Sequence, residues 1–415
     1  MSTTMEKITS ADLIGMEDKH GAHNYHPLEV VLKRGEGVHV WDVEGKQYYD
    51  FLSAYSAVNQ GHCHPKIVGA MVDQAKRLTL TSRAFYNDSL GPYEKFVTEY
   101  FGYDKVLPMN TGAEAVETAI KLCRKWAYEV KGISENAAQI IVCENNFHGR
   151  TTTIVSFSSD PVASKNFGPY TPGFIRIPYN DTDALEKALK ENKNVAGFLV
   201  EPIQGEAGVY VPDEGYLTKA KELCAANGAL FIADEVQTGI ARTGRLLAVD
   251  HENVKADILI LGKAISGGAY PVSAVFADNA IMNVIKPGQH GSTFGGNPVA
   301  SKVAIAALEV VTDEALAENA EHLGQIFRKE MQRIIDSSDL VLKVRGKGLL
   351  NAIIVNDTEE SETAWNLCCA LKENGLLAKP THGNIIRFAP PLVMTEEQLM
   401  DCVRIIEETI NAFEK

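Results

Sequence analysis

The chain has 415 residues, of which 45% are hydrophobic and 23% are charged, a composition typical of a soluble globular protein with a large core. Its 40 lysine and arginine residues are outnumbered by 54 aspartate and glutamate residues, so the formal net charge is −14. This acidity argues against nucleic acid or an anionic membrane as a partner. No apolar run approaches the roughly 18 residues of a membrane span.

The seven cysteines are scattered and odd in number, and none forms a CxxC pair. This pattern predicts free thiols in a reducing compartment. The acidic residues Glu6, Asp12, Glu17 and Asp18 come early, which is atypical of a signal or transit peptide. We therefore expect a cytoplasmic protein whose residues 1–24 form a mobile or loosely docked arm.

Two short strand patterns flank Glu44-Gly45 and predict a hairpin. From about residue 105 to 270, apolar runs alternate with helical stretches. This rhythm predicts a mainly parallel sheet with helices on both faces. Strands are expected at residues 106–109, 140–143, 197–200, 230–233 and 258–261, with helices such as 113–130 and 215–227 between them.

The last third of the chain has a different rhythm. Two long helical patterns, roughly residues 299–311 and 314–335, follow Asn297-Pro298, and smaller strands and helices then alternate at 341–355, 363–374, 385–388 and 395–413. We therefore predict an N-terminal segment (residues 1–60) that contributes to a small domain, a large α/β domain (61–297), connecting helices (298–335) and a C-terminal small α+β domain (336–415).

Two buried strands end on polar residues that suit one cofactor. The segment 231–233 leads into Asp234, and the segment 259–261 leads through Gly262 into Lys263. Lys263 follows Asp234 by 29 residues. This separation suits a crossover to a parallel strand, which would bring both side chains to one edge of the sheet. Pyridoxal phosphate needs an amine that holds its aldehyde as an imine, and a buried carboxylate that keeps its ring nitrogen protonated. Lys263 and Asp234 meet those needs.

The phosphate group needs a cradle of donors. Thr111, Gly112 and Ala113 stand where a strand passes into a helix, so the free amides and the helix dipole there favour an anion. A plain strand–turn–helix junction would have the same local pattern. Ser292 and Thr293, within a glycine-rich loop, offer a second set of donors with a weaker signal.

Together these residues resemble the class III aminotransferases, and within that family the branch that uses ornithine. The resemblance runs from Gly21 to about Phe413. It is carried by Gly21-Ala22-His23-Asn24-Tyr25-His26-Pro27, Asn59-Gln60-Gly61-His62-Cys63-His64-Pro65, Asn146-Phe147-His148-Gly149-Arg150-Thr151, Glu201-Pro202-Ile203-Gln204-Gly205-Glu206-Ala207-Gly208, Arg387-Phe388-Ala389-Pro390-Pro391 and the Asp234 and Lys263 motifs.

The resemblance implies a fold-type I enzyme that depends on pyridoxal phosphate. Its large domain would have a mostly parallel sheet beside a small α+β domain, and a homodimer would share its active sites. Beside Lys263 and Asp234, the implied cofactor ligands are Gly112 and Ala113 on the phosphate, Thr293 from the partner subunit, Phe147 and Val236 on the two ring faces, and Gln237 on the phenolic oxygen.

The implied reaction moves the δ-amino group of L-ornithine to 2-oxoglutarate, giving glutamate 5-semialdehyde and glutamate. Tyr25 and Arg150 would hold the α-carboxylate of ornithine, and Tyr55 would shape the pocket against other amines. Arg387 would bind the α-carboxylate of 2-oxoglutarate, and Glu206 would mask it while ornithine is bound.

One position departs from this branch. His148 stands where many ornithine enzymes have tryptophan, whereas histidine is common among acetylornithine relatives. Acetylornithine or 4-aminobutyrate aminotransferase is therefore the alternative, and Tyr55 argues against the latter. A PLP-binding regulatory protein without turnover is a remote alternative.

Two further motifs suggest other ligands. His62-Cys63-His64 resembles a metal site but has no companion ligands at suitable spacing, so we expect no metal. Arg345-Gly346-Lys347-Gly348 lacks the spacing of a P-loop, and a turn between strands is the expected structure there.

Overall fold

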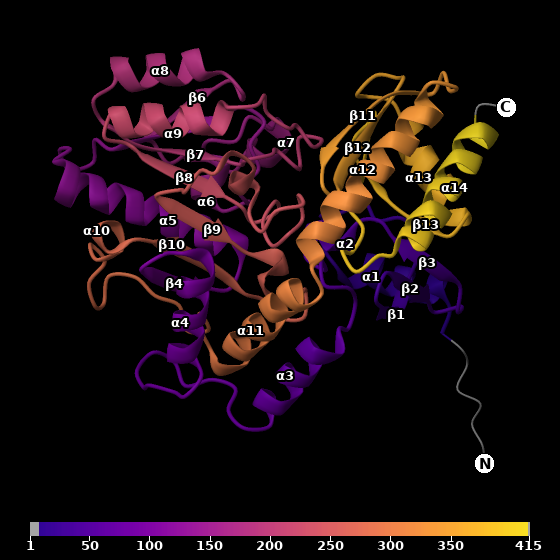
Figure 1. Ribbon diagram of the computed structural model, residues 1–415, viewed down its shortest axis with the longest axis horizontal. Coiled ribbons are helices and arrows are strands. Elements are labelled where there is room, and N and C mark those ends of the chain that lie inside the picture. The colour runs from indigo at the N-terminus through magenta and orange to yellow at the C-terminus, as the bar shows by residue number, and fades with distance from the viewer. Residues whose placement is uncertain (1–7, 414–415) are drawn as a thin grey trace.

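The computed structural model describes residues 8–413, and a seven-stranded sheet forms its centre (Figure 1). The strand order is β4-β10-β9-β8-β7-β5-β6. Pairing is parallel from β9 to β6, whereas β10 is antiparallel to both β4 and β9. The bounds are β4 Lys105–Met109, β5 Gln139–Cys143, β6 Phe174–Ile177, β7 Val195–Val200, β8 Leu230–Asp234, β9 Ile258–Leu261 and β10 Ser273–Ala277.

The mostly parallel sheet and its five expected strands are confirmed, and two further strands, β6 and β10, complete it. Alternate residues of each central strand enter two separate cores. Phe231 and Leu259 pack into one core, and Ile232 and Ile258 pack into the other. Because a strand that is buried on both sides alternates between two apolar layers, helices must cover both faces.

Helices of the large sheet have clear sequence causes. Helix α5 begins after Thr111, which forms a capping box with Glu114, and its apolar stripe packs on β7, β9 and β10. The helices between residues 53 and 298 are α2 Ser53–Ser56, α3 Pro65–Ala75, α4 Leu90–Phe101, α5 Gly112–Trp126, α6 Thr152–Val155, α7 Pro161–Ser164, α8 Thr182–Glu191, α9 Tyr216–Ala226 and α10 Asn279–Met282, together with short turns at Ala127–Lys131, Ala248–Glu252 and Lys263–Ser266.

Two consecutive helices lead from the large sheet to a second group of elements. Helices α11 (Pro298–Asp313) and α12 (Leu316–Ile335) pass between the two groups in Figure 1. One four-stranded sheet has the order β11-β12-β15-β14, and another has the order β1-β2-β3-β13. The bounds are β1 Leu32–Glu36, β2 His39–Asp42, β3 Gln47–Asp50, β11 Val341–Lys347, β12 Leu350–Val355, β13 Leu376–Leu377, β14 Lys379–His382, β15 Ile385–Phe388, α13 Thr363–Glu373 and α14 Glu396–Phe413.

Strand β13 pairs in parallel with β3, so the N-terminal and C-terminal parts of the chain share one sheet. The expected hairpin is confirmed, with β2 antiparallel to β3 across Glu44-Gly45. Of the N-terminal arm, residues 1–7 lie outside the described structure. Its remainder includes α1 (Ser10–His20), which buries no residue and is tied to Glu44 through Ser10. The domain boundaries stay predictions. Between residues 8 and 413, no helix has the length and apolar character that a membrane crossing requires.

Candidate active site

Asp234 and Lys263 meet at one edge of the large sheet, as the sequence predicts. Asp234 is the last residue of β8, and its register partner on β9 is Ile260. Lys263 follows the end of β9 by two residues and has a φ of 47°. Because β8 and β9 are parallel neighbours, their carboxyl ends open into the same cavity.

The cavity collects most of the predicted cofactor residues. Its lining includes Gly112, Ala113, Phe147, Asp234, Val236, Gln237 and Lys263. Thr111, Ser292 and Thr293 do not line it within this chain. Thr111 caps α5, Ser292 accepts a hydrogen bond from Asn110 at 2.8 Å, and Thr293 is exposed.

The start of α5 forms the rim of the cavity. The amides of Gly112 and Ala113 belong to its first turn, where backbone N–H groups have no intrahelical acceptor. A side chain at Gly112 would lie 2.9 Å from the methyl group of Val236 and would intrude on the cavity. This glycine therefore keeps space beside an anion-binding helix end.

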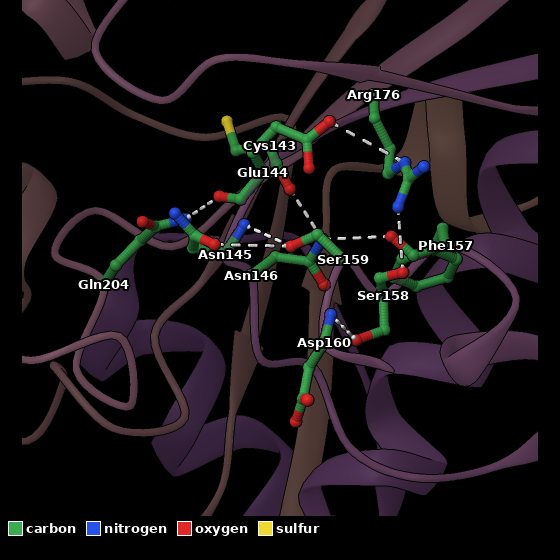
Figure 2. Close-up of polar contacts among 10 residues, drawn as sticks. All are labelled: Cys143, Glu144, Asn145, Asn146, Phe157, Ser158, Ser159, Asp160, Arg176 and Gln204. Carbon is green, nitrogen blue, oxygen red and sulfur yellow. Dashed lines mark hydrogen bonds and ion pairs between the residues drawn. The ribbon is translucent and has the colours of Figure 1, made fainter. Parts of the chain in front are cut away.

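Hydrogen bonds between side chains and backbone, drawn in Figure 2, fix the residues on either side of the loop that carries Phe147, His148 and Arg150. Asn146 donates to the carbonyls of Cys143 and Phe157, and the Asn145 amide donates to Ser159 Oγ at 2.7 Å. These contacts join residues 143–146, before the loop, to residues 157–159, after it. Its middle is thereby held over the cavity, where Phe147 and His148 both line the wall.

Arg176 and Gln204 extend the same network to neighbouring strands. Arg176 donates to the carbonyl of Ser158 at 3.0 Å, and Gln204 donates to the carbonyl of Glu144 at 2.8 Å (Figure 2). The loop is therefore anchored on the sheet and on the Glu201–Gly208 segment at the same time.

A buried group of three ionisable side chains forms the floor of the cavity. His148 Nδ1 lies 2.6 Å from Asp234 Oδ2, and Glu201 accepts a hydrogen bond from the Phe147 amide at 2.9 Å. Burial opposes protonation of His148, but the hydrogen bond to Asp234 and its charge outweigh burial and raise the pKa of the imidazole. Burial raises the pKa of Glu201 to about 8, although the charge of His148 acts in the opposite direction.

At neutral pH Glu201 is therefore protonated, and the contact with Asp234 favours the protonated form of the His148 imidazole. Nε2 of His148 is buried and has no hydrogen-bond partner among the described residues. The Asp234 carboxylate faces both the histidine and the cavity, so it can serve a cationic ring nitrogen as well.

A second group of charges also acts on Lys263. Arg387 on β15 is 2% exposed and donates to Glu206 at 2.7 Å and to Gln237 at 3.1 Å. Gln237 in turn donates to Glu206 at 2.8 Å. Tyr55 places its ring centroid 5.0 Å from the Arg387 guanidinium. The three polar side chains form a closed hydrogen-bonded ring that satisfies a buried arginine charge.

Charges also tune the groups beside the cavity. Burial alone would raise the pKa of Glu206, but the positive charges of Arg387 and Lys263 outweigh it and hold the pKa at about 2. Burial lowers the pKa of Lys263, while Glu206 acts in the opposite direction. A lysine of lowered pKa is a better nucleophile and base near neutral pH.

The remaining predicted substrate residues are more exposed. Tyr25 is 68% exposed, and Arg150 places its guanidinium 5.8 Å from the ring centroid of Phe147. Both act electrostatically on Tyr55, as do Glu206 and Arg387. The five predicted substrate residues therefore lie near one another.

The site fits pyridoxal phosphate in its shape and its donors. Lys263 offers an amine, Asp234 offers a buried carboxylate, and the start of α5 offers free amides for a phosphate. Phe147 and Val236 line the cavity as apolar neighbours for a planar ring.

His148 and Glu201 are the site residues whose role sequence reasoning missed. Each gave a usable signal, since His148 directly follows the predicted stacking residue Phe147 and Glu201 directly follows the buried strand β7. The contacts that hold His148 and Glu201 join segments that are 86 and 54 residues apart in the chain, which no local pattern displays. In the His62-Cys63-His64 motif, which resembles a metal site, His62 bonds Asp50 at 2.7 Å. No cluster of three or more potential metal ligands occurs within residues 8–413.

Replacing Glu201 by glutamine should change the pH dependence of stability. The folded pKa of about 8 exceeds the unfolded value of 4.5, so Glu201 contributes most below pH 4.5, and this contribution is lost as pH rises to about 8. Glu201→Gln should therefore gain stability relative to the wild type between pH 5 and pH 9, by up to about 3–5 kcal/mol. Urea unfolding of the cofactor-free protein measures this.

Glu222 on α9 is exposed and provides a matched control. The stability difference between Glu222→Gln and the wild type should be the same at pH 5 and at pH 9. A stability difference for Glu201→Gln that does not change between pH 5 and pH 9 would show that Glu201 is not protonated at neutral pH.

Comparison with known proteins agrees with this geometry. The family model for class-III aminotransferases matches residues 20–410. The mitochondrial ornithine aminotransferase of Rattus norvegicus is 62% identical over 397 residues, which cover 96% of this chain and 90% of the relative.

Two solved structures are similar over nearly their whole length. The ornithine aminotransferase of Toxoplasma gondii is 51% identical with a TM-score of 0.96, and the alignment covers 98% of this chain and 96% of that one. The acetylornithine aminotransferase of Elizabethkingia anophelis is 68% identical with a TM-score of 0.90, covering 97% and 99%. This chain belongs to the class-III aminotransferase family.

Proposed function

We propose that this protein is an ornithine δ-aminotransferase that uses pyridoxal phosphate and passes the amino group to 2-oxoglutarate. The observation that carries the proposal is the buried Glu206–Arg387 pair next to Lys263. The ornithine aminotransferases among its relatives, at 53–62% identity over nearly full length, support the same substrate.

Bound pyridoxal phosphate supplies an electron sink for the negative charge that develops on the carbon bearing the substrate amine. In our proposal Lys263 would hold the aldehyde, and its amine would take the proton from the δ-carbon of ornithine. Asp234 would keep the ring nitrogen protonated, with His148 Nδ1 hydrogen-bonded to the same carboxylate. Phe147 and Val236 would pack against the ring.

With the cofactor ring beside Lys263 and Asp234, the other residues of the site can contact its phosphate and its phenolic oxygen. Gly112 and Ala113 donate amides to the phosphate, with Thr111 and Ser292 at the rim. Gln237 has two amide hydrogens, and only one of them is used by Glu206. The second hydrogen is therefore free to reach the phenolic oxygen.

The two substrates differ in charge, and the Glu206–Arg387 pair can respond to that difference. Ornithine has one carboxylate and two amines, whereas 2-oxoglutarate has two carboxylates. An unmasked Arg387 would draw the α-carboxylate of ornithine to the cofactor and present the wrong amine. With Glu206 bound to Arg387, Tyr25 and Arg150 take that carboxylate instead, and the δ-amine reaches Lys263.

The arrival of 2-oxoglutarate reverses this arrangement. Its α-carboxylate replaces Glu206 on Arg387, because a planar guanidinium can bind a carboxylate through two parallel N–H groups, whereas Glu206 is bound through Nη1 and Nε has no partner among the described residues. Arg150 takes the distal carboxylate. The alternative is a Glu206–Arg387 ion pair with a structural role only.

Acetylornithine aminotransferase is the second candidate, and two observations favour it. The enzyme of that name from Elizabethkingia anophelis is 68% identical to this chain, and His148 occupies the position discussed above. A side-by-side assay of ornithine, acetylornithine and 4-aminobutyrate decides between the candidates. Ornithine should give the highest kcat/KM of the three, and a preference for acetylornithine would refute our assignment.

We also propose a cytoplasmic homodimer. The seven cysteines are all free, as expected in a reducing compartment. Thr293 is exposed and stays outside the cavity of its own chain, and next to it Phe294 is 52% exposed. Phe85 and Tyr86 are also exposed, and solvent-facing aromatic side chains of this kind are enriched at protein interfaces. A partner subunit would cover them and use Thr293.

Lys263 should be the single attachment point of the cofactor. After borohydride reduction with pyridoxal phosphate and peptide mapping, we expect the label on Lys263. Lys263→Ala should lose turnover while still binding the cofactor without a covalent bond. Lys131 is the control, because it is also half-buried with a pKa lowered by burial, yet its ammonium group bonds Val195 and Asn227 carbonyls. Lys131→Met should keep the label, and a label on any other lysine contradicts the assignment.

Arg387→Ala should slow the 2-oxoglutarate half-reaction by about tenfold or more relative to the ornithine half-reaction, a difference of about 1.4 kcal/mol in barrier. Glu206→Gln should admit transfer of the α-amine of ornithine. Single-turnover absorbance, followed for each half-reaction, measures both effects. Arg345→Ala is the control, since Arg345 contacts the Gly208 carbonyl rather than Glu206. Equal losses in both halves, with regiochemistry unchanged in Glu206→Gln, would leave the ion pair with a structural role only.

Mixing two inactive or impaired chains tests the shared site. Hybrids of Lys263→Ala and Thr293→Ala chains should differ from both parents in cofactor affinity, because each hybrid contains one intact and one doubly altered site. Sedimentation at working concentration should show a dimer. An active monomer would refute the shared site.

A further inference from the structure

Four consecutive residues beside the active site have a left-handed backbone. Ser53, Ala54, Tyr55 and Ser56 have φ angles of 49°, 48°, 62° and 69°, and none of them is glycine. In this region the Cβ atom crowds the carbonyl oxygen, so each of the four carries a steric cost. Such a run persists only where surrounding contacts hold it, and backbone strain of this kind gathers at functional sites.

Asp50, at the end of β3, holds the start of this turn. Its Oδ1 accepts hydrogen bonds from the amides of Leu52 at 2.9 Å and Ser53 at 2.8 Å. The Asp50 carboxylate is 8% exposed, so these bonds form away from water. They fix the direction in which the chain enters the left-handed turn.

His62 holds Asp50 in turn. Its Nε2 lies 2.7 Å from Asp50 Oδ2, the oxygen that the turn does not use. The His62 backbone is itself fixed, because it exchanges two hydrogen bonds with Gly37. A side chain at Gly35 would meet His62 at 2.8 Å, which shows how closely the hairpin approaches the ring.

The far end of the turn is tied to the large domain. The amides of Ala57 and Val58 donate to the Ser53 carbonyl at 2.8 and 3.1 Å. Gln60 then donates to the carbonyl of Ala264, the residue after Lys263, at 2.9 Å. Both ends of the left-handed turn are therefore anchored, one on β3 and the other on the lysine loop.

The turn determines where Tyr55 points. The ring of Tyr55 covers Arg387 at 5.0 Å, and burial together with the charge of Glu206 raises the pKa of its hydroxyl. A right-handed backbone at these four residues would send the Tyr55 side chain in another direction, because the Cα–Cβ bond follows φ and ψ. Asp50 and His62 touch no residue of the Glu206–Arg387 pair in the contacts described above.

We propose that Asp50 and His62 are positioning residues that hold the left-handed turn at 53–56 and thereby keep Tyr55 over Arg387, which sets the preference for ornithine over 4-aminobutyrate. The inference rests on the proposed function, since it concerns the choice between two amines. The amine of 4-aminobutyrate is at the opposite end from its single carboxylate, so this carboxylate takes the distal position that Arg150 serves for ornithine. The Tyr55 ring lies between this position and Arg387, within electrostatic range of both, so its direction sets the space for the far end of each amine.

Substitution of His62 tests the first anchor. His62→Ala should lower the ratio of kcat/KM for ornithine to kcat/KM for 4-aminobutyrate by about tenfold. His62→Gln should restore most of the ratio, because the glutamine amide can donate to Asp50 from nearly the same place as Nε2. A merely structural role would lower both kcat/KM values together and leave their ratio unchanged.

Ala54 tests the backbone itself, because its side chain is exposed and can affect the site only through the turn. Ala54→Gly keeps the left-handed conformation without steric cost and should leave the ratio unchanged. Ala54→Val should lower it by about tenfold, as His62→Ala does, since a β-branched residue is a severe outlier in this region. Urea unfolding and sedimentation should show that all four variants are folded and assembled alike.

Crystal structures of His62→Ala and Ala54→Val separate this inference from the proposed function. Relaxation of φ at residues 53–56 together with a lower ratio supports the inference. A turn that stays left-handed with an unchanged ratio overturns it, and so does a relaxed turn with an unchanged ratio. Failure of the proposed function has a different signature, because the wild-type enzyme would then show no preference for ornithine, and Tyr55→Ile would leave the ratio unchanged.

Discussion

The parallel pairing of β8 and β9 is the constraint on which the site depends. It brings the carboxyl ends of two strands to one edge, so that Asp234 and Lys263 share a cavity although 29 residues separate them in the chain. The start of α5 opens at the same edge and adds free amides. A lysine, a carboxylate and an anion-binding helix end are therefore placed by the sheet rather than by any local motif.

Electrostatic balance within the cavity follows from burial. On one side, His148 and Asp234 form a close pair, and Glu201 avoids a third buried charge by staying protonated at neutral pH. On the other side, Arg387 is neutralised by Glu206 through a pair that a carboxylate substrate can exchange. Charges of both groups act on Lys263, and burial is the main cause of its lowered pKa.

Contacts between the smaller sheets and the large sheet complete the pocket. Arg387 belongs to β15, whereas its partner Glu206 follows β7 of the large sheet. Tyr55 comes from the turn after β3, which is joined to the lysine loop through Gln60. Substrate recognition in our proposal therefore combines three sheets, and a small shift between them would change the space above the cofactor without touching Lys263 or Asp234.

The sequence by itself determined the alternation of strands and helices, the Asp234 and Lys263 pair and the start of α5, because burial periodicity and strand-end residues are local signals. It missed β6 and β10, although these strands are as long as β9 and β8, which it found. Only the tertiary structure placed His148 against Asp234, raised the pKa of Glu201 and revealed the left-handed turn under Tyr55. Those features arise from burial and from contacts between distant segments. The spacing of neighbouring residues in the sequence shows neither burial nor such contacts.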